Sequence, residues 1–178
     1  YTITYNVTDG ALNAATEVIR TVNVIDTVVP MIALVGDATV MMECGDVYTD
    51  TGATATDDCE GDLTGSIVTT GVVNTNVPGV YTMYYNVSDG SGNVAVEVTR
   101  TVNVEDNTPP VISLVGDAIL MMECGDIYTD AGAAATDGCE GDLTGSIATT
   151  GIVDTAIPGA YTVRYNVSDG SGNVAAEV

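Results

Sequence analysis

The sequence predicts an all-β protein built from tandem copies of one 80-residue unit. Two observations carry this prediction. Long stretches return almost unchanged 80 positions later, and apolar residues within the unit alternate with a period of two, as in half-buried strands. No stretch has the 3.6-residue period of an amphipathic helix.

The repeat is clearest in MMECGDVYTDTGATATDDCEGDLTGSI, residues 41–67, which returns as MMECGDIYTDAGAAATDGCEGDLTGSI at residues 121–147. No insertion breaks the register, and the unit is far longer than one solenoid turn and close in length to a small sandwich domain. We therefore predict three segments in order: the C-terminal strand pair of a preceding repeat, a complete repeat, and a repeat lacking its last strand. They span residues 1–25, 26–105 and 106–178.

The joints between units carry proline. Residues 26–30 read DTVVP and residues 106–110 read DNTPP. Proline fixes φ and biases its predecessor toward extended geometry, which predicts short, stiff linkers. Val28 and Val29 stand where the second joint has Thr-Pro, so the first linker has one proline fewer.

Strands within the unit follow from alternation and turn residues. Apolar and polar residues alternate over 81–88, the segment 89–93 (DGSGN) has the residues of a hairpin turn, and alternation resumes over 94–99. Upstream, the short runs VISLVG, AILMMECG, GAAATD and SIATTGIV are separated by Gly-rich breaks. About seven short strands per unit predict a two-sheet immunoglobulin-like sandwich.

Two arginines do not fit the alternation. Arg20 and Arg100 fall on the apolar phase of their strands. Either a β-bulge turns the side chain outward, or the arginine is buried in an ion pair with a carboxylate. The sequence leaves both explanations open.

The net charge of the chain limits the classes of molecule that it can bind. The chain has 25 acidic residues, three basic ones and a net charge of −22, so it repels nucleic acid and anionic lipid and attracts cations. With 46% apolar residues it is expected to fold. No apolar run approaches the roughly 18 residues of a membrane span, so we predict no membrane insertion, and a leader or anchor would lie outside this segment.

Missing residue types exclude several chemistries. Without histidine or lysine, the chain cannot form Ser-His-Asp or Cys-His nucleophile systems, Schiff bases or P-loops. A pair of carboxylates could still serve as acid and base, but 25 acids spread through turns produce such pairs by chance. We therefore predict that the segment is not an enzyme.

At this point the residues carry a resemblance. The motifs DNTPPVISLVGD, ECGDIYTDAGAAATDGCEGDLT and PGAYTVRYNVSDGSGNVA resemble bacterial immunoglobulin-like repeats of the pesticidal-crystal-protein type, which are similar to hyalin repeats. The resemblance covers the whole chain. It implies an extracellular or cell-surface β-sandwich, used in stalks, adhesive arrays or accessory modules, without activity of its own.

The cysteines agree with an extracellular location. Cys44 and Cys59 lie in one unit, and Cys124 and Cys139 lie 15 residues apart in the next. An even count with one pair per unit predicts a disulfide within each unit, worth about 3 kcal/mol on the chain-entropy estimate. Two cysteines without histidine make only half a zinc site.

Clustered oxygen donors in the turns and joints suggest calcium, which accepts six to eight oxygens in flexible geometry. The spacing does not fit an EF-hand, and Asp58 becomes Gly138 in the next unit. The alternative is that these residues are solvated turn formers. The candidate ligands are Asp26, Asp57, Glu60, Asp62, Asp89, Asn93, Asp106, Asp137, Glu140, Asp142, Asp169 and Asn173.

One N-x-Ser/Thr triplet per unit offers a glycosylation candidate, at Asn6, Asn86 and Asn166. Residue 1 aligns with Tyr81 and residue 178 with Val98. Residues 19–24 of a neighbouring molecule could donate the missing strand, but residues 1–18 would then duplicate 161–178. We therefore expect a slice of a much longer polypeptide or filament.

Together these features predict a structural repeat segment of an extracellular or cell-surface fibre or adhesin, stiffened by calcium and disulfides. Its partners would be further copies of the repeat, and surface glycans or other cells. The alternative is a non-catalytic binding or spacer module attached to a secreted enzyme, and a carboxylate hydrolase comes third.

Overall fold

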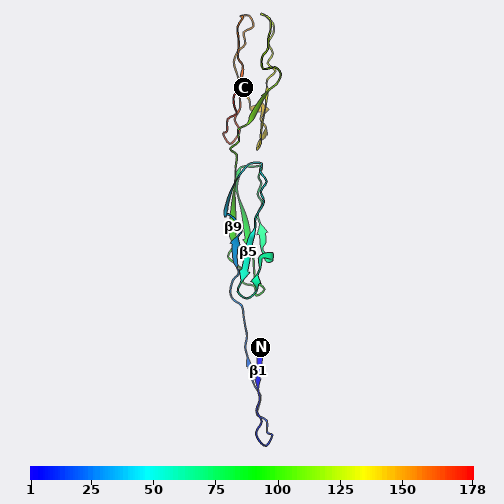
Figure 1. Cartoon of the computed structure of the whole chain (residues 1–178), viewed down its shortest axis with the longest axis vertical. Helices are drawn as coiled ribbons and strands as arrows, with labels where there is room; N and C mark the ends of the chain where they lie inside the picture. The colour runs from blue at the N-terminus through cyan, green and yellow to red at the C-terminus, as the bar shows by residue number, and fades with distance from the viewer. The chain divides into compact units, whose positions relative to one another are not determined.

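The computed structural model describes residues 1–178 and confirms the all-β prediction (Figure 1). Besides strands it contains two single-turn 3₁₀ helices, η1 (Thr64–Ser66) and η2 (Thr144–Ser146), and no helix has the length and apolar character to cross a membrane. Contacts divide the chain into two compact units. One comprises Tyr1–Ala33, Ala53–Val68 and Tyr85–Val98, and the other Leu34–Gly52, Thr69–Tyr84 and Thr99–Val178.

The first unit contains a hairpin and a small sheet. Strands β1 (Thr2–Tyr5) and β2 (Val18–Thr21) pair antiparallel, and every residue of both is exposed. Three strands, β3 (Met31–Leu34), β5 (Ala53–Asp57) and β6 (Gly61–Asp62), form a sheet in the order β3-β5-β6.

A four-stranded sheet, lying largely in the second unit, has the order β4-β9-β8-β7. Its edge strand β4 (Thr39–Glu43) runs parallel to β9 (Val98–Glu105), so both strands end at the same edge, with Glu43 opposite Glu105. The other two strands are β7 (Val68–Thr70) and β8 (Gly79–Asn86). Alternation along β9 points Arg100, Val102 and Val104 inward.

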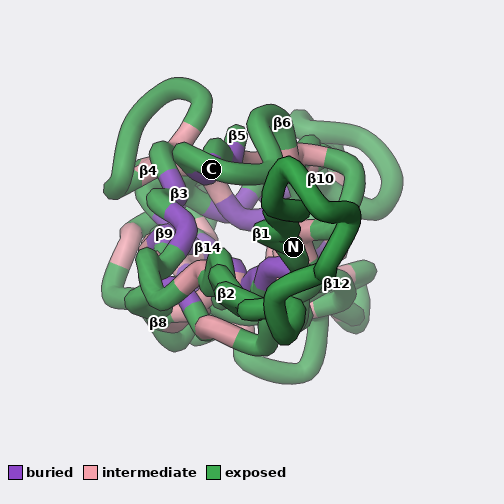
Figure 2. Tube along the Cα trace, turned by 90° about the horizontal axis from the view of Figure 1, so that it is seen from below, coloured by how far each residue is buried: buried purple, intermediate pink, exposed green.

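The repeat beginning at residue 106 forms two further sheets. Strands β10 (Val111–Leu114), β11 (Ala133–Asp137) and β12 (Gly141–Asp142) form one, and β13 (Ala148–Thr150) pairs antiparallel with β14 (Arg164–Asn166) in the other. Its core is built on Ile112, Ala135, Tyr165, Val167 and Ala175. The residues 80 positions earlier are also buried, namely Ile32, Ala55, Tyr85, Val87 and Ala95. Figure 2 shows that such buried stretches are short and that most of the trace is exposed.

Two predicted strands are wrong in extent. The strand expected over 94–99 begins only at Val98, because the turn at Asp89 holds Val94 in an isolated bridge with Ser88. The run 118–125 forms no strand, although its counterpart contains β4. β4 is held by its pairing with β9, and no strand lies alongside 119–123 in the same way.

Arg100 is buried, with 1% of its surface exposed. Its guanidinium forms an ion pair with Asp50 and donates to three backbone carbonyls, among them those of Asp37 at 2.9 Å and Gly52 at 3.2 Å. The third is that of Val35. Of the two explanations for this arginine, the buried ion pair is therefore correct.

Asp130 is the counterpart of Asp50 in the next repeat and, like Asp50, accepts a hydrogen bond from a tyrosine two residues earlier. Asp130 accepts hydrogen bonds from the hydroxyl groups of Tyr165 and Tyr128. The bond to Asp130, together with burial, raises the pKa of Tyr165 to about 12. The same aspartate position thus anchors an inward side chain in both repeats.

We expect Arg100→Met to destabilise the protein by about 3–5 kcal/mol, because it removes the cation beside Asp50 and the donors to three backbone carbonyls. The matched control is Arg164→Met, which breaks an exposed pair with Glu177 at 3.2 Å and should cost less than about 1 kcal/mol. Urea unfolding measures both free energies. Equal effects of the two substitutions would contradict the assignment of Arg100.

Candidate metal centre

Three carboxylates meet at the start of the second repeat. Oxygens of Asp106, Asp137 and Asp169 all lie within 4.8 Å of one another. The three residues are buried, with 8%, 9% and 7% of their surfaces exposed. We call this group the second acidic cluster.

Three different elements bring these residues together. Asp106 directly follows β9, Asp137 is the last residue of β11, and Asp169 opens the turn after β14. Because the strands end at this edge, residues more than 60 positions apart in the sequence become neighbours. The Nδ2 group of Asn173 ties two of them, donating to the Asp106 carbonyl at 3.0 Å and to Asp169 Oδ2 at 2.8 Å.

Local hydrogen bonds orient each carboxylate. Asp137 Oδ1 accepts from the backbone N–H of Cys139 at 2.7 Å and of Glu140 at 2.9 Å. Asp106 Oδ2 accepts from the hydroxyl of Ser171 at 3.1 Å. Burial alone would raise the pKa of Asp169, but hydrogen bonds from Asn173 and neighbouring backbone N–H groups hold it below the usual range.

One oxygen in the second acidic cluster is left over. Asp137 Oδ2 is buried and accepts no hydrogen bond. A buried carboxylate oxygen without a partner costs free energy, and two further carboxylates beside it add repulsion. The chain's two ion pairs, Arg100–Asp50 and Arg164–Glu177, lie elsewhere. A cation is the group that would satisfy this arrangement.

The first repeat has an equivalent, the first acidic cluster. It brings together Asp26, Asp57 and the thiol of Cys59 within 4.8 Å. Asp26 Oδ2 and Asp57 Oδ2 are again buried without a hydrogen bond. Asn93 repeats the bonds of its counterpart, donating to the Asp26 carbonyl at 3.3 Å and to Asp89 Oδ2 at 2.7 Å.

The remaining candidate ligands lie outside both clusters, and among them is Asp89, although its counterpart Asp169 belongs to the second acidic cluster. Glu60 and Glu140 accept from the backbone N–H groups of Gly90 and Gly170, each at 2.7 Å. A Cβ atom at Gly90 would lie 2.6 Å from Glu60 Oε1, so a larger residue there would displace the flexible Glu60 side chain. Asp62 and Asp142 each accept from the backbone N–H of the threonine two residues later, at 2.9 Å.

The predicted pairing of cysteines within each repeat is wrong. The structure joins Cys44 to Cys139, 95 residues apart, with Cα atoms separated by 5.4 Å, and leaves Cys59 and Cys124 as free, exposed thiols. The reason is the parallel pairing of β4 with β9. It carries Cys44 to the end of β9, where its N–H donates to the Glu105 carbonyl at 2.7 Å beside the start of the next repeat.

The same edge also holds the linker. Glu43 Oε1 accepts from the Asn107 backbone N–H at 2.7 Å and from the Thr108 hydroxyl at 2.9 Å. The disulfide, these hydrogen bonds and the second acidic cluster therefore all lie at the passage from one repeat to the next. Sequence reasoning missed Glu43, since only the parallel register reveals what it faces.

Comparison with known families identifies the repeats. The family described as "Bacterial surface protein, Ig-like domain" matches residues 32–104 and 112–178. The chain belongs to this family. The immunoglobulin-like part of the predicted fold is thereby confirmed, and membership indicates a surface-associated structural or binding module.

Solved structures give weaker similarities. The lipoprotein BT2262 from Bacteroides thetaiotaomicron is 20% identical with a TM-score of 0.40, over 79% of this chain and 61% of that one. A structure of CBM51-2 in complex with GlcNAc and INT domains from Clostridium perfringens ZmpB is 22% identical with a TM-score of 0.36, over 50% of this chain and 21% of that one. No curated protein matches. The chain thus spans less than two thirds of both solved structures.

The glycosylation candidates occupy equivalent places in the Ig-like repeats. Nδ2 of Asn86 donates to Glu97 at 2.6 Å, and Nδ2 of Asn166 donates to Glu177 at 2.8 Å. With its amide nitrogen turned toward Glu17, Asn6 makes the corresponding contact at 3.3 Å. Each amide nitrogen that would carry a glycan therefore has a glutamate carboxylate as its partner.

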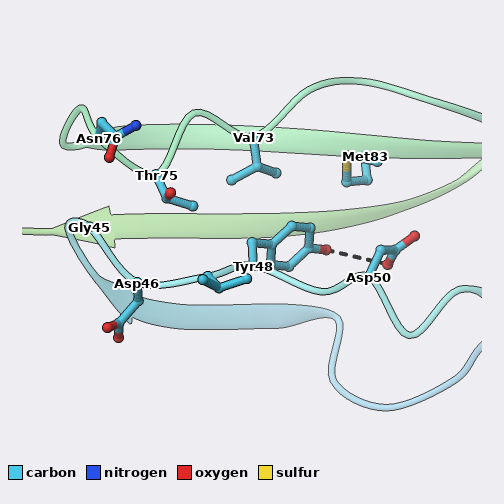
Figure 3. Close-up of a pocket in the computed structure, with 9 residues that line it drawn as sticks. Gly45, Asp46, Tyr48, Asp50, Val73, Thr75, Asn76 and Met83 are labelled. Atoms are coloured by element: carbon cyan, nitrogen blue, oxygen red, sulfur yellow. Dashed lines mark hydrogen bonds between the residues drawn. The ribbon is translucent and has the colours of Figure 1, made fainter.

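The Ig-like repeat from residue 26 also contains a pocket of about 570 Å³. Figure 3 shows the ring of Tyr48 in this pocket with its hydroxyl directed at Asp50, to which it donates at 3.3 Å, while Asp46 points away. Val73 and Met83 supply apolar walls. Asp50 is already the ion-pair partner of Arg100, so its role here is structural.

We expect Glu43→Gln to lower the melting temperature at pH 7 but not in acid. The Asn107 backbone N–H, the Thr108 hydroxyl and the Asn107 side chain hold the pKa of Glu43 below its usual range. A depressed folded-state pKa contributes stability above the unfolded value, about 4.3, and that stability is lost as the pH falls through the folded pKa. Thermal unfolding of both proteins from pH 7 to pH 3 would show the difference disappearing.

The control is Glu123→Gln, which makes the same charge change at the equivalent exposed position. Its melting temperature should differ little from that of the parent chain at every pH. A pH-independent effect of Glu43→Gln would contradict the role of its charge at the linker.

Proposed function

We propose that this chain is a structural repeat segment of an extracellular or cell-surface fibre of the adhesive kind, in which calcium bound at the acidic clusters fixes each repeat to the next. The observation that carries the proposal is the buried, unpartnered Oδ2 of Asp57 and of Asp137, each inside a cluster that includes the first residue of a linker. The repeats are those of residues 26–105 and 106–178, following the strand pair of residues 1–25.

The chemistry of the donors supports calcium. The second acidic cluster offers only oxygen, from three carboxylates, with the hydroxyl of Ser171 beside them. Calcium takes six to eight oxygen ligands in flexible geometry, whereas zinc and copper favour nitrogen and sulfur. A divalent ion would also relieve the self-repulsion of a chain with net charge −22.

The position of the clusters supports a mechanical role. Asp106 precedes Asn107 and Thr108, which donate hydrogen bonds to Glu43. An ion bound to Asp106 and to the carboxylates of the next repeat would therefore hold the same linker from the side of that repeat. No carboxylate residue is a member of either core of apolar side chains. Removal of the ion would therefore loosen the joints and leave the sandwiches folded. The resemblance to repeats of the pesticidal-crystal-protein type supports the same use as a spacer.

Calorimetry with the whole chain tests the proposal. We expect uptake of calcium with dissociation constants of roughly 10⁻⁴ to 10⁻³ M, typical of extracellular modules. Asp137→Asn should abolish one site, because the amide keeps the Oδ1 acceptor for Cys139 and Glu140 but removes the charge. Without calcium the same variant should melt no lower than the parent, since it removes a source of repulsion.

The control is Asp142→Asn, an identical change in a residue that caps Thr144 outside the cluster. It should leave calcium uptake unaltered. Absence of calcium uptake at millimolar concentration, or equal loss of uptake in both variants, would overturn the calcium site and leave the surface module without an ion at its joints.

A further inference from the structure

We propose that a disulfide joins consecutive repeats at every joint, and that Cys59 and Cys124 each take part in one such bond. The partner of each is the corresponding cysteine of an adjoining copy of this repeat. Cys59 would bond to the Cys44-type residue of the preceding copy, and Cys124 to the Cys139-type residue of the following copy. The result is one covalent link per joint along an array.

The disulfide already present defines the pattern. Cys44 of one repeat is bonded to Cys139 of the next. Shifting that bond by one 80-residue period maps Cys139 onto Cys59 and Cys44 onto Cys124, which are the two free thiols. Each free cysteine is thus the translated copy of one that is bonded to a neighbouring repeat.

The loops that carry Cys59 and Cys139 have the same backbone geometry. The N–H of Cys59 donates to Asp57 Oδ1 at 2.8 Å, and the N–H of Cys139 donates to Asp137 Oδ1 at 2.7 Å. Both cysteines therefore lie in the same kind of aspartate turn, beside an acidic cluster. The loop of Cys59 therefore needs no rearrangement for Cys59 to form a bond equivalent to the one that Cys139 forms with Cys44.

The loops that follow Cys44 and Cys124 also have the same backbone geometry. After Cys44, the N–H of Gly45 donates to the Thr75 carbonyl at 2.7 Å, and after Cys124 the N–H of Gly125 donates to the Thr155 carbonyl at 2.8 Å. The loop that presents Cys44 to the next repeat is therefore already formed around Cys124.

Exposed apolar surface marks the same end. Cys44 packs with Cys139 in a cluster that includes Val40, Met42 and Tyr81. Around Cys124, the counterparts Leu120 and Tyr161 are 59% and 40% exposed, and Ile119 is 80% exposed. In the cluster around Cys44 the equivalent side chains pack with Val102 and Val104 of β9, and residues 106–178 contain no counterpart of that strand, which accounts for the exposure.

The bond requires an oxidant. Two thiols lose two protons and two electrons to form one S–S bond, and the electrons pass to molecular oxygen or, by thiol–disulfide exchange, to a low-molecular-weight disulfide that is reduced to two thiols. Oxidising extracellular surroundings supply both classes of oxidant.

The test lengthens the chain by one repeat, through insertion of a second copy of residues 26–105 directly after Glu105. Both proteins are oxidised in air with chelator present, unfolded, alkylated without reduction and mapped by mass spectrometry. The parent chain should show two free thiols, at Cys59 and Cys124. The lengthened chain should again show two, although it has two more cysteines, because the inserted Cys59 is now bonded to Cys44 of the first copy.

The matched control replaces Cys44 of the first copy by serine in the lengthened chain. Under the proposal, the Cys59 of the inserted copy becomes the additional alkylated residue. Pairing within repeats would instead free the Cys59 of the first copy and would leave no free thiol in the unmodified lengthened chain. That outcome, or four free thiols in the lengthened chain, would overturn the proposal, and the chelator makes the result independent of calcium.

Discussion

Two carboxylate oxygens, Oδ2 of Asp57 and Oδ2 of Asp137, are buried without a hydrogen bond at equivalent positions of two repeats. Such a group is unfavourable unless a cation or a proton completes it. Each lies where the last residue of a strand meets a linker aspartate, so the passage between repeats is organised around a concentration of negative charge. The apolar cores are built from alternating residues and include no carboxylate residue.

The parallel pairing of β4 with β9 connects this charge to the covalent structure. It brings Glu43 and Cys44 to the end at which β9 leaves the sandwich, so that one reaches the linker and the other reaches Cys139. A surface protein that bears tension along its chain gains from such an arrangement, because the joint is held by side chains of both repeats as well as by the backbone. Family membership in bacterial surface Ig-like domains fits this use.

Features that depend on local pattern could be predicted from the sequence. Alternation over residues 81–88 placed Tyr85 and Val87 in the core correctly, and the turn chemistry placed Asp89 and Asn93 together. The same alternation was wrong for Val94 and Val96, which are exposed. Partners set by long-range pairing could not be predicted. Fifteen residues separate Cys44 from Cys59, but its bonding partner is decided by a parallel register that the sequence does not display. For the same reason, the ligands predicted from the sequence include residues such as Asp62, whose carboxylate instead accepts a hydrogen bond from the backbone N–H of Thr64.

The most direct test of the account is a crystal structure of the whole chain grown with millimolar calcium. The account predicts an ion within about 2.3–2.6 Å of carboxylate oxygens from Asp106, Asp137 and Asp169, and a second ion at Asp26 and Asp57. Asp137 Oδ2 should be among the ligands of the ion at the second acidic cluster. Water molecules hydrogen-bonded to these oxygens at both clusters, with no ion at that concentration, would contradict it.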